Sequence, residues 1–135
     1  MAKDLSFAKH GASIFWVSSE NPDHPSSNIV DADNRTFFYS TGLFPQEVII
    51  AFPHRAKISK LRTITQYVKS YDVYYCNDDE PTGNWNHLLQ VLIPPKDKSH
   101  VENSSVAFEA AFLKIVITSG YNHFVKIYRV ICEGK

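Results

Sequence analysis

Cysteine and glycine are scarce in this chain of 135 residues, and neither sign of charge is in excess. The two cysteines, Cys76 and Cys132, are too few for a disulfide framework and lack the paired spacing of a structural zinc site. Both stand in apolar runs, which predicts small buried side chains in a reducing compartment, with a single bridge as the alternative. The five glycines form neither a phosphate-cradling loop nor a Gly-x-Ser-x-Gly turn, which argues against a nucleotide site.

Opposite charges cancel along the chain. Fourteen Lys and Arg balance fourteen Asp and Glu, so no overall positive field would recruit nucleic acid or an anionic membrane surface. The basic cluster of segment 55–62 is interpreted as a solvated face, with acidic residues 78–80 supplying opposite charge elsewhere. The N-terminus lacks a signal-like apolar core, and no apolar run approaches the ~18 residues of a membrane span. We therefore expect a cytosolic protein without a nucleic-acid partner or membrane insertion.

Catalytic and metal-binding signatures built on histidine are also missing. The six histidines are scattered without the short spacings that place two imidazoles beside one metal ion. We expect a binding protein and not an enzyme, with a site assembled from distant residues as the remaining catalytic alternative.

Short runs rich in β-branched and aromatic residues are abundant and predict strands almost throughout the chain. Segments with Pro, Gly, Asn and Asp separate these runs and are typical of turns. The pattern predicts one all-β domain, residues 1–135, folded as a sandwich of about eight strands, with a short helical turn between Pro25 and Asp31. The predicted strands are Ser13–Ser18, Val48–Phe52, Lys57–Thr65, Val68–Asn77, His87–Ile93, Ser104–Ala110, Phe112–Ser119 and Val125–Glu133.

A polar loop within the segment Asn28–Glu47 is the strongest candidate for a site. Asn28, Asp31, Asp33 and Thr36 offer side-chain oxygens within nine positions, which suits a hard cation such as calcium. The loop lacks the glycine-centred spacing of an EF-hand. Asn and Asp also close turns by bonding nearby backbone, so an ordinary Asx turn is the alternative.

Aromatic side chains exceed what the core of a small sandwich needs. We interpret them first as core residues with Tyr hydroxyls at the rim, then as a protein interface, and third as a platform for sugars. The residues concerned are Trp16, Phe37, Phe38, Tyr39, Phe44, Tyr67, Tyr71, Tyr74, Tyr75, Trp85, Tyr121 and Phe124.

Two segments of the sequence resemble the intraflagellar transport subunit 25 family. The first runs from His24-Pro25 through Asn28-Ile29-Val30-Asp31 and Thr36-Phe37 to Ser40-Thr41-Gly42-Leu43-Phe44-Pro45-Gln46-Glu47-Val48-Ile49-Ile50. The second comprises Ile117-Thr118-Ser119-Gly120-Tyr121-Asn122-His123-Phe124 and the closing Cys132-Glu133-Gly134. Between Ala51 and Ala111 the likeness is one of pattern.

This resemblance implies a galactose-binding-like jelly roll of about eight antiparallel strands. It also implies a non-enzymatic subunit of the intraflagellar transport B complex, paired with a Rab-like small GTPase, subunit 27, and located in the cytoplasm, basal body and cilium or flagellum. A calcium-stabilised carbohydrate-binding module is the alternative function for the same fold.

The resemblance further implies a structural calcium ion in the polar loop. Its ligands would be the backbone carbonyl of Asn28 and the side-chain oxygens of Asp31 and Thr36, with Glu133 closing the site from the last strand. Where the family commonly has Gly after the Asp, this chain has Ala32, which is unfavourable if the backbone there takes a positive φ. Where the family commonly has Trp after Thr-Phe, this chain has Phe38.

Overall fold

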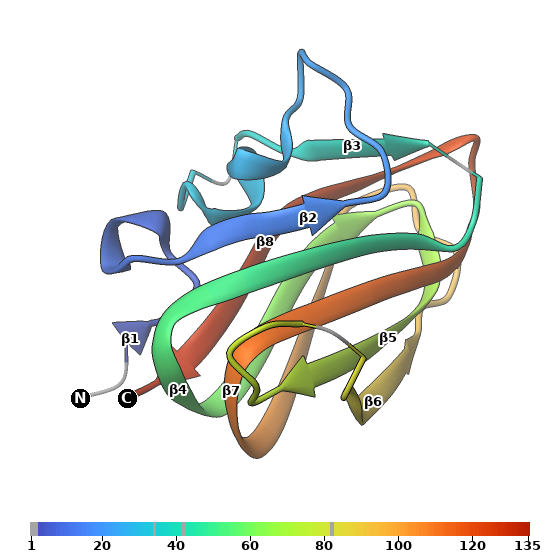
Figure 1. Ribbon diagram of the computed structural model, residues 1–135. Coiled ribbons are helices and arrows are strands. Elements are labelled where there is room, and N and C mark those ends of the chain that lie inside the picture. The colour runs from blue at the N-terminus through green and yellow to red at the C-terminus, as the bar shows by residue number, and fades with distance from the viewer. Residues whose placement is uncertain (1–2, 34, 42, 82) are drawn as a thin grey trace.

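The computed structural model describes residues 3–33, 35–41, 43–81 and 83–135. Its described residues form eight strands and two short 3₁₀ helices, and every strand pair is antiparallel (Figure 1). The all-β prediction is thus confirmed. The elements are β1 Lys3–Asp4, η1 Ala8–His10, β2 Ser13–Val17, η2 Ser26–Val30, β3 Phe38–Thr41, β4 Gln46–Gln66, β5 Val68–Cys76, β6 Asn86–Leu92, β7 His100–Gly120 and β8 Phe124–Gly134.

Two layers of strands face each other across the core. One layer contains β2, the first part of β4, the second part of β7, β5 and β6. The other contains β3 and β1 along one edge of β8, followed by the second part of β4 and the first part of β7. We call these the five-stranded and the four-stranded sheet; β1, a strand of two residues, extends the edge of the latter.

Both β4 and β7 are 21 residues long and run through both sheets, bending from one to the other at one end of the sandwich (Figure 1). The prediction of separate strands on either side of Pro53 and of Ala111 was therefore wrong. The β4–β7 pairing is interrupted between Ala51 and Ala56. Pro53 lies in this interruption, where its missing backbone N–H costs no hydrogen bond to β7. The bend thus tolerates a residue that breaks regular strands.

Strand alternation fills the space between the layers. Val73 and Leu113 from the five-stranded sheet, and Ile127 and Val130 from the four-stranded sheet, are almost completely buried. Each such side chain contributes roughly 1.5–3 kcal/mol through removal of its apolar surface from water. The neighbours of these residues in each strand point outward, so the sequence pattern leaves two outer sheet faces for function.

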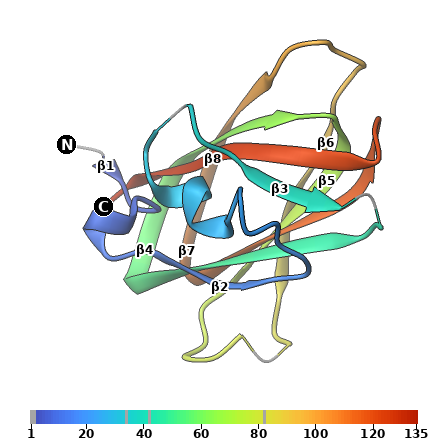
Figure 2. The ribbon, with the colours of Figure 1, turned by 90° about the horizontal axis from the view of Figure 1, so that it is seen from above.

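The predicted helical turn and the predicted burial of the two cysteines are confirmed. Residues Ser26–Val30 form η2, which lies against β2, β3 and β8 and buries Ile29 in the core (Figure 2). Cys76 and Cys132 are free thiols with no exposed surface, and burial raises the pKa of the Cys132 thiol. Among the described residues, none forms a helix of the length and apolarity that a membrane crossing requires.

Candidate functional site

The polar loop leaves η2 at Asp31 and is closed by hydrogen bonds within itself. One carboxylate oxygen of Asp31 accepts a hydrogen bond from the Asp33 backbone N–H at 2.9 Å, and the other accepts one from the Thr36 hydroxyl at 2.6 Å. The Asn28 side-chain N–H₂ donates to the Phe37 carbonyl at 3.0 Å, which ties the end of η2 to the start of β3. These are the Asx-type bonds that the sequence allowed as the alternative.

The loop nevertheless gathers the oxygen atoms that the calcium prediction named for Asp31 and Thr36. The Thr36 hydroxyl lies within hydrogen-bond distance of both the Asp31 carboxylate and the Asp33 carbonyl, the latter at 3.0 Å. Carboxylate, hydroxyl and carbonyl oxygens are the donors that calcium prefers, and a hydroxyl can rotate its hydrogen away to present a lone pair. The chemistry of these oxygen ligands fits calcium. Asn28 is held close to the same loop by its hydrogen bond to the Phe37 carbonyl.

The charged side chains of the loop are Asp31, which is half-buried, and Asp33 and Arg35, which form an ion pair. The Arg35 guanidinium contacts both oxygens of the Asp33 carboxylate at 3.1 Å and holds the pKa of that carboxyl below its ordinary value. Among the described residues, no group of three His, Cys, Asp or Glu side chains gathers around one point. The predicted fourth contributor, Glu133, lies on β8, where its backbone pairs with Asp4 and Lys60.

Ala32 adopts a left-handed backbone conformation, the positive φ that was expected to be unfavourable for alanine at this position. Its φ is 62°, a region that glycine enters freely and that costs an alanine roughly 1 kcal/mol. The loop therefore holds its shape against a local strain, which its hydrogen bonds through Asp31 offset.

The outer face of the four-stranded sheet carries interlocked aromatic rings, which we call the stacked face. Tyr39 of β3 stacks on Phe124 of β8, with centroids 4.5 Å apart and planes 13° apart. His24 stacks on Phe37 at 4.1 Å, and the Lys126 ammonium lies 4.5 Å from the Phe37 ring centroid. All of these side chains are half-buried. The rings thus find most of their partners within the chain.

The outer face of the five-stranded sheet is built differently, because β2 contains a β-bulge. Ile14 pairs with Ile50 and Trp16 pairs with Ile49, so Phe15 is the extra residue between them. Phe15 packs edge-to-face on Phe112 of β7, whose ring is buried on this outer side. Trp16, opposite the outward-facing Ile49, shares the same side. A regular strand would send two consecutive residues to opposite faces, and the bulge brings both to one.

We call this second surface the bulge face. Phe15 is 54% exposed and Trp16 is 49% exposed, beside the apolar cluster of Ile49, Cys76 and Phe112. Large side chains that remain half in water despite an apolar neighbourhood mark an interaction surface.

Polar groups surround the apolar part of the bulge face. The Lys114 ammonium lies 4.4 Å from the Trp85 ring centroid and 3.8 Å from a carboxylate oxygen of Glu47. His87 contacts the Asp72 carboxylate at 2.9 Å on the neighbouring strands β6 and β5. An apolar centre with paired charges around it is the usual composition of a protein interface.

The expectation that the aromatics belong first to the core holds for part of the set, since Phe44, Tyr67 and Tyr75 also pack against the core from half-buried positions. Of the twelve residues named for their excess, Phe38 and Tyr71 are buried, whereas the other ten are half-buried or exposed. Strand alternation could have predicted part of this placement. Phe38 is buried, and its sequence neighbours Phe37 and Tyr39 therefore point outward. Phe15 gave no such signal, since a bulge depends on the register of the partner strand.

These two outer faces and the strand order define a galactose-binding-like jelly-roll sandwich. The sequence model of the F5/8 type C domain matches residues 15–130, and the chain belongs to the F5/8 type C domain family.

The chain is also similar to two curated relatives over almost its whole length. It is 27% identical to the intraflagellar transport protein 25 homolog of Homo sapiens, with 97% of this chain and 92% of the relative covered. It is 26% identical to intraflagellar transport protein 25 of Chlamydomonas reinhardtii, with 98% and 70% covered. The resemblance found in the sequence is thereby confirmed.

Solved structures support the fold. A family 32 carbohydrate-binding module from the NanJ protein of Clostridium perfringens, in complex with galactose, superposes with a TM-score of 0.81 at 14% identity and covers 98% of this chain and 99% of that one. At this identity the likeness shows a shared fold.

Proposed function

We propose that this chain is a non-enzymatic structural subunit of the intraflagellar transport B complex, which holds a Rab-like small GTPase, subunit 27, on its bulge face. The names of the curated relatives support the transport role. The β-bulge that places Phe15 and Trp16 side by side on one outer face carries the choice of surface. The protein would work in the cytoplasm, at the basal body and in the cilium or flagellum.

Energetics favour the bulge face over the stacked face as the partner surface. Interfaces draw most of their affinity from a few large side chains, with Trp prominent, that become fully buried near the centre. Trp16 and Phe15 have about half of their surface still to bury, whereas Tyr39 and Phe37 are already covered by Phe124 and His24 respectively. Binding at the bulge face would therefore remove more apolar surface from water.

The test is co-expression with candidate Rab-like GTPases, followed by size-exclusion chromatography. The unmodified chain is expected to elute with one candidate as a heterodimer. The double variant Phe15→Ser with Trp16→Ser is expected to elute alone, because loss of two central anchors weakens binding by about 100-fold or more.

A matched control replaces exposed apolar residues elsewhere. Leu92, 72% exposed on β6, and Tyr121, 41% exposed after β7, can both become Ser. This control is expected to keep the heterodimer. Elution of the unmodified chain alone with every candidate would reject the partner assignment, and loss of the heterodimer in both double variants would reject the bulge face.

We further propose that the polar loop binds a structural calcium ion through the Asn28 carbonyl, Asp31 and Thr36. The all-oxygen donor set around the Thr36 hydroxyl supports this proposal. Bound calcium would brace the junction between η2 and β3. The measurement is thermal unfolding in millimolar calcium against a chelator, since a ligand that binds only the native state raises stability by mass action.

The calcium test needs a variant that keeps the loop folded. Thr36→Ser retains the hydroxyl and is expected to retain the calcium-dependent rise in melting temperature, whereas Asp31→Asn is expected to lose it. An identical melting temperature in calcium and in chelator for the unmodified chain, together with no binding heat by calorimetry, would reject the proposal.

Carbohydrate binding is the rival function, because exposed aromatic rings such as Trp16 also form platforms for sugars. A glycan array separates the two functions. A reproducible sugar ligand that Trp16→Ser abolishes would favour the rival, whereas an empty array with a stable heterodimer supports the transport subunit.

A further inference from the structure

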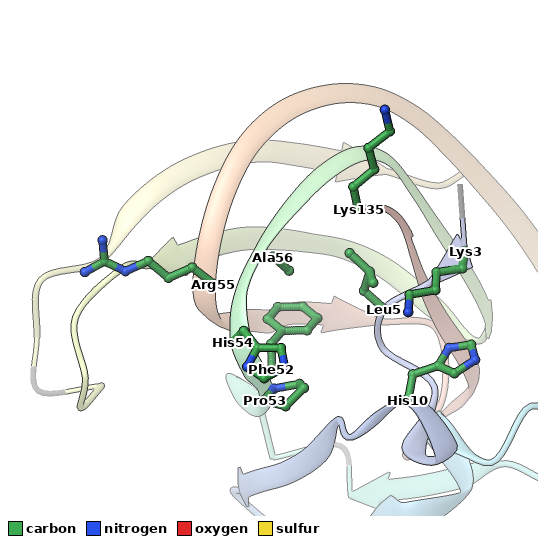
Figure 3. A pocket seen from close by; sticks show the side chains of 9 residues that line it. All are labelled: Lys3, Leu5, His10, Phe52, Pro53, His54, Arg55, Ala56 and Lys135. Atoms are coloured by element: carbon green, nitrogen blue, oxygen red, sulfur yellow. The ribbon is translucent and has the colours of Figure 1, made fainter. Parts of the chain in front are cut away.

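A cavity of about 160 Å³ opens where the two chain ends meet the bend of β4. Residues of four separate segments line it: Lys3 and Leu5, His10, the stretch Phe52–Ala56 of β4, and Lys135 (Figure 3). Its lining residues are distinct from those of the bulge face and of the polar loop. We call it the terminal cavity.

Positive and ionisable nitrogen groups dominate the walls of the terminal cavity. Five of its nine lining residues are Lys, Arg or His, and none of the described lining residues is acidic. Figure 3 shows Lys3 and His10 on one side and the His54 ring on the other, while Arg55 and Lys135 extend outward from the rim. The chain as a whole carries no net charge, so this concentration is local.

The carboxylate of Asp4, beside the cavity, is engaged elsewhere. Asp4, adjacent to Lys3 in sequence, bonds the Arg129 guanidinium at 3.2 Å and the backbone N–H of Cys132 at 3.1 Å. Among the ion pairs between described residues, none includes Lys3, Arg55 or Lys135. The cations of the cavity therefore keep their charge available for an occupant.

The floor of the terminal cavity is apolar. Phe52 and Ala56 are 8% and 6% exposed, and Figure 3 shows Leu5 on the same inner side. The His10 ring bonds the Asp4 carbonyl oxygen through Nδ1 at 2.7 Å, and because a carbonyl cannot donate, Nδ1 carries the hydrogen. His10 is thus held at the wall with its second ring nitrogen left for an occupant.

We propose that the terminal cavity binds an acidic peptide segment of a protein partner. One apolar side chain of that segment rests on Phe52 and Leu5. Carboxylates of the neighbouring peptide residues meet Lys3, His10 and the rim cations. The charge of the walls is complementary to carboxylates, and the volume takes a single side chain. This site is additional to the GTPase surface and does not depend on it.

A peptide suits the cavity better than a phosphate group. Phosphate sites typically use paired guanidinium donors or the backbone N–H groups at the start of a helix. Here the single guanidinium, that of Arg55, extends outward from the rim, and the walls supply separated point charges over an apolar floor. Separated carboxylates on a peptide match that arrangement.

The test uses the full chain, isotope-labelled for NMR, and a probe of sequence acetyl-Glu-Glu-Leu-Asp-Glu-Glu-amide at low ionic strength. We expect backbone signals of residues 3–5 and 52–56 to shift on titration. The double variant Lys3→Glu with Arg55→Glu is expected to weaken binding about tenfold, because attraction becomes repulsion at two exposed positions. The matched control, Lys69→Glu with Lys98→Glu, makes the same change of net charge away from the cavity and is expected to bind as the unmodified chain does.

Four further probes, two altered peptides, inorganic phosphate and vesicles with anionic lipid, complete the experiment. A peptide with Gln and Asn in place of Glu and Asp is expected not to bind, and one with Ser in place of Leu is expected to bind more weakly. No shift at millimolar peptide, or equal weakening in both double variants, would overturn the proposal. Inorganic phosphate that shifts the same signals at lower concentration, or vesicles with anionic lipid that do so while the peptide does not, would overturn it as well.

Discussion

The two outer faces of the sandwich hold similar aromatic side chains and use them in opposite ways. On the stacked face, Tyr39 lies flat on Phe124 and Phe37 lies flat on His24, so each ring is covered by another ring of the same chain. On the bulge face, Phe15 touches Phe112 with one edge and Trp16 remains about half exposed.

This difference separates stability from binding. A ring covered within its own chain contributes its free energy to folding, whereas an exposed ring keeps that free energy for a partner. Substitutions on the stacked face should therefore change the free energy of unfolding, and those at the exposed edge of the bulge face should change affinity.

The largest expected loss of stability comes from the base of the bulge face. Phe112→Ala is expected to lower the free energy of unfolding by about 3 kcal/mol, because the removed ring leaves a cavity beneath Phe15. Urea unfolding followed by circular dichroism measures this, with Phe112→Leu as the milder control. A loss below about 1 kcal/mol would contradict the close packing of Phe112 beneath Phe15.

Tyr39→Ala is the matched test of the stacked face. It removes contacts with both His24 and Phe124, and we expect a loss of about 2 kcal/mol with unchanged GTPase affinity. Phe15→Ala, which removes a more exposed ring, is expected to cost less than about 1 kcal/mol while it weakens the GTPase complex. If the two variants exchange these effects, the assignment of the faces is reversed.

Two lysines allow a smaller and more exact comparison. Lys126→Met removes a cation that lies near the Phe37 and Tyr67 rings. Lys114→Met removes one that lies near the Trp85 and Tyr74 rings and also contacts the Glu47 carboxylate. We expect losses of about 0.5 and about 1 kcal/mol respectively, because methionine keeps the aliphatic stem and loses only the charge. The difference should shrink when unfolding is repeated in high salt, and equal losses at both positions would contradict the ranking.

The smallest expected effect is a gain, at the loop that leads into the stacked face. Ala32→Gly removes the strain of a positive φ, partly offset by the greater freedom of glycine in the unfolded chain, for a net rise in stability of about 0.5 kcal/mol. The control Ala51→Gly, at a position of β4 that pairs with both β2 and β7, is expected to lower stability by about 0.5–1 kcal/mol. A melting temperature that falls in both variants would contradict a strained Ala32.

Patterns that repeat along a single strand were predictable from sequence. The alternation of Leu113, Ile115 and Ile117 correctly indicated the buried side of β7, and turn residues correctly separated most strands. The continuity of β4 through Pro53 was not predictable in this way, because it depends on where β7 stops pairing.

Features assembled from distant segments gave the sequence reading no signal. The basic run around Arg55 was interpreted as an ordinary solvated face, yet the fold brings Lys3, His10 and Lys135 to the same place. Charge balance over the whole chain concealed this local concentration. The polar loop is the opposite case, since Asp31 and Thr36 are five positions apart and meet through local hydrogen bonds.

The two long strands, β4 and β7, have a consequence for how the molecule comes apart. Each is a member of both sheets, and together they share 15 register pairs spread across the two layers. Separation of either sheet would pull these strands out of the other sheet as well. We therefore expect the sandwich to unfold in one cooperative transition, with amide protons in both layers exchanging at a common slow rate set by global unfolding.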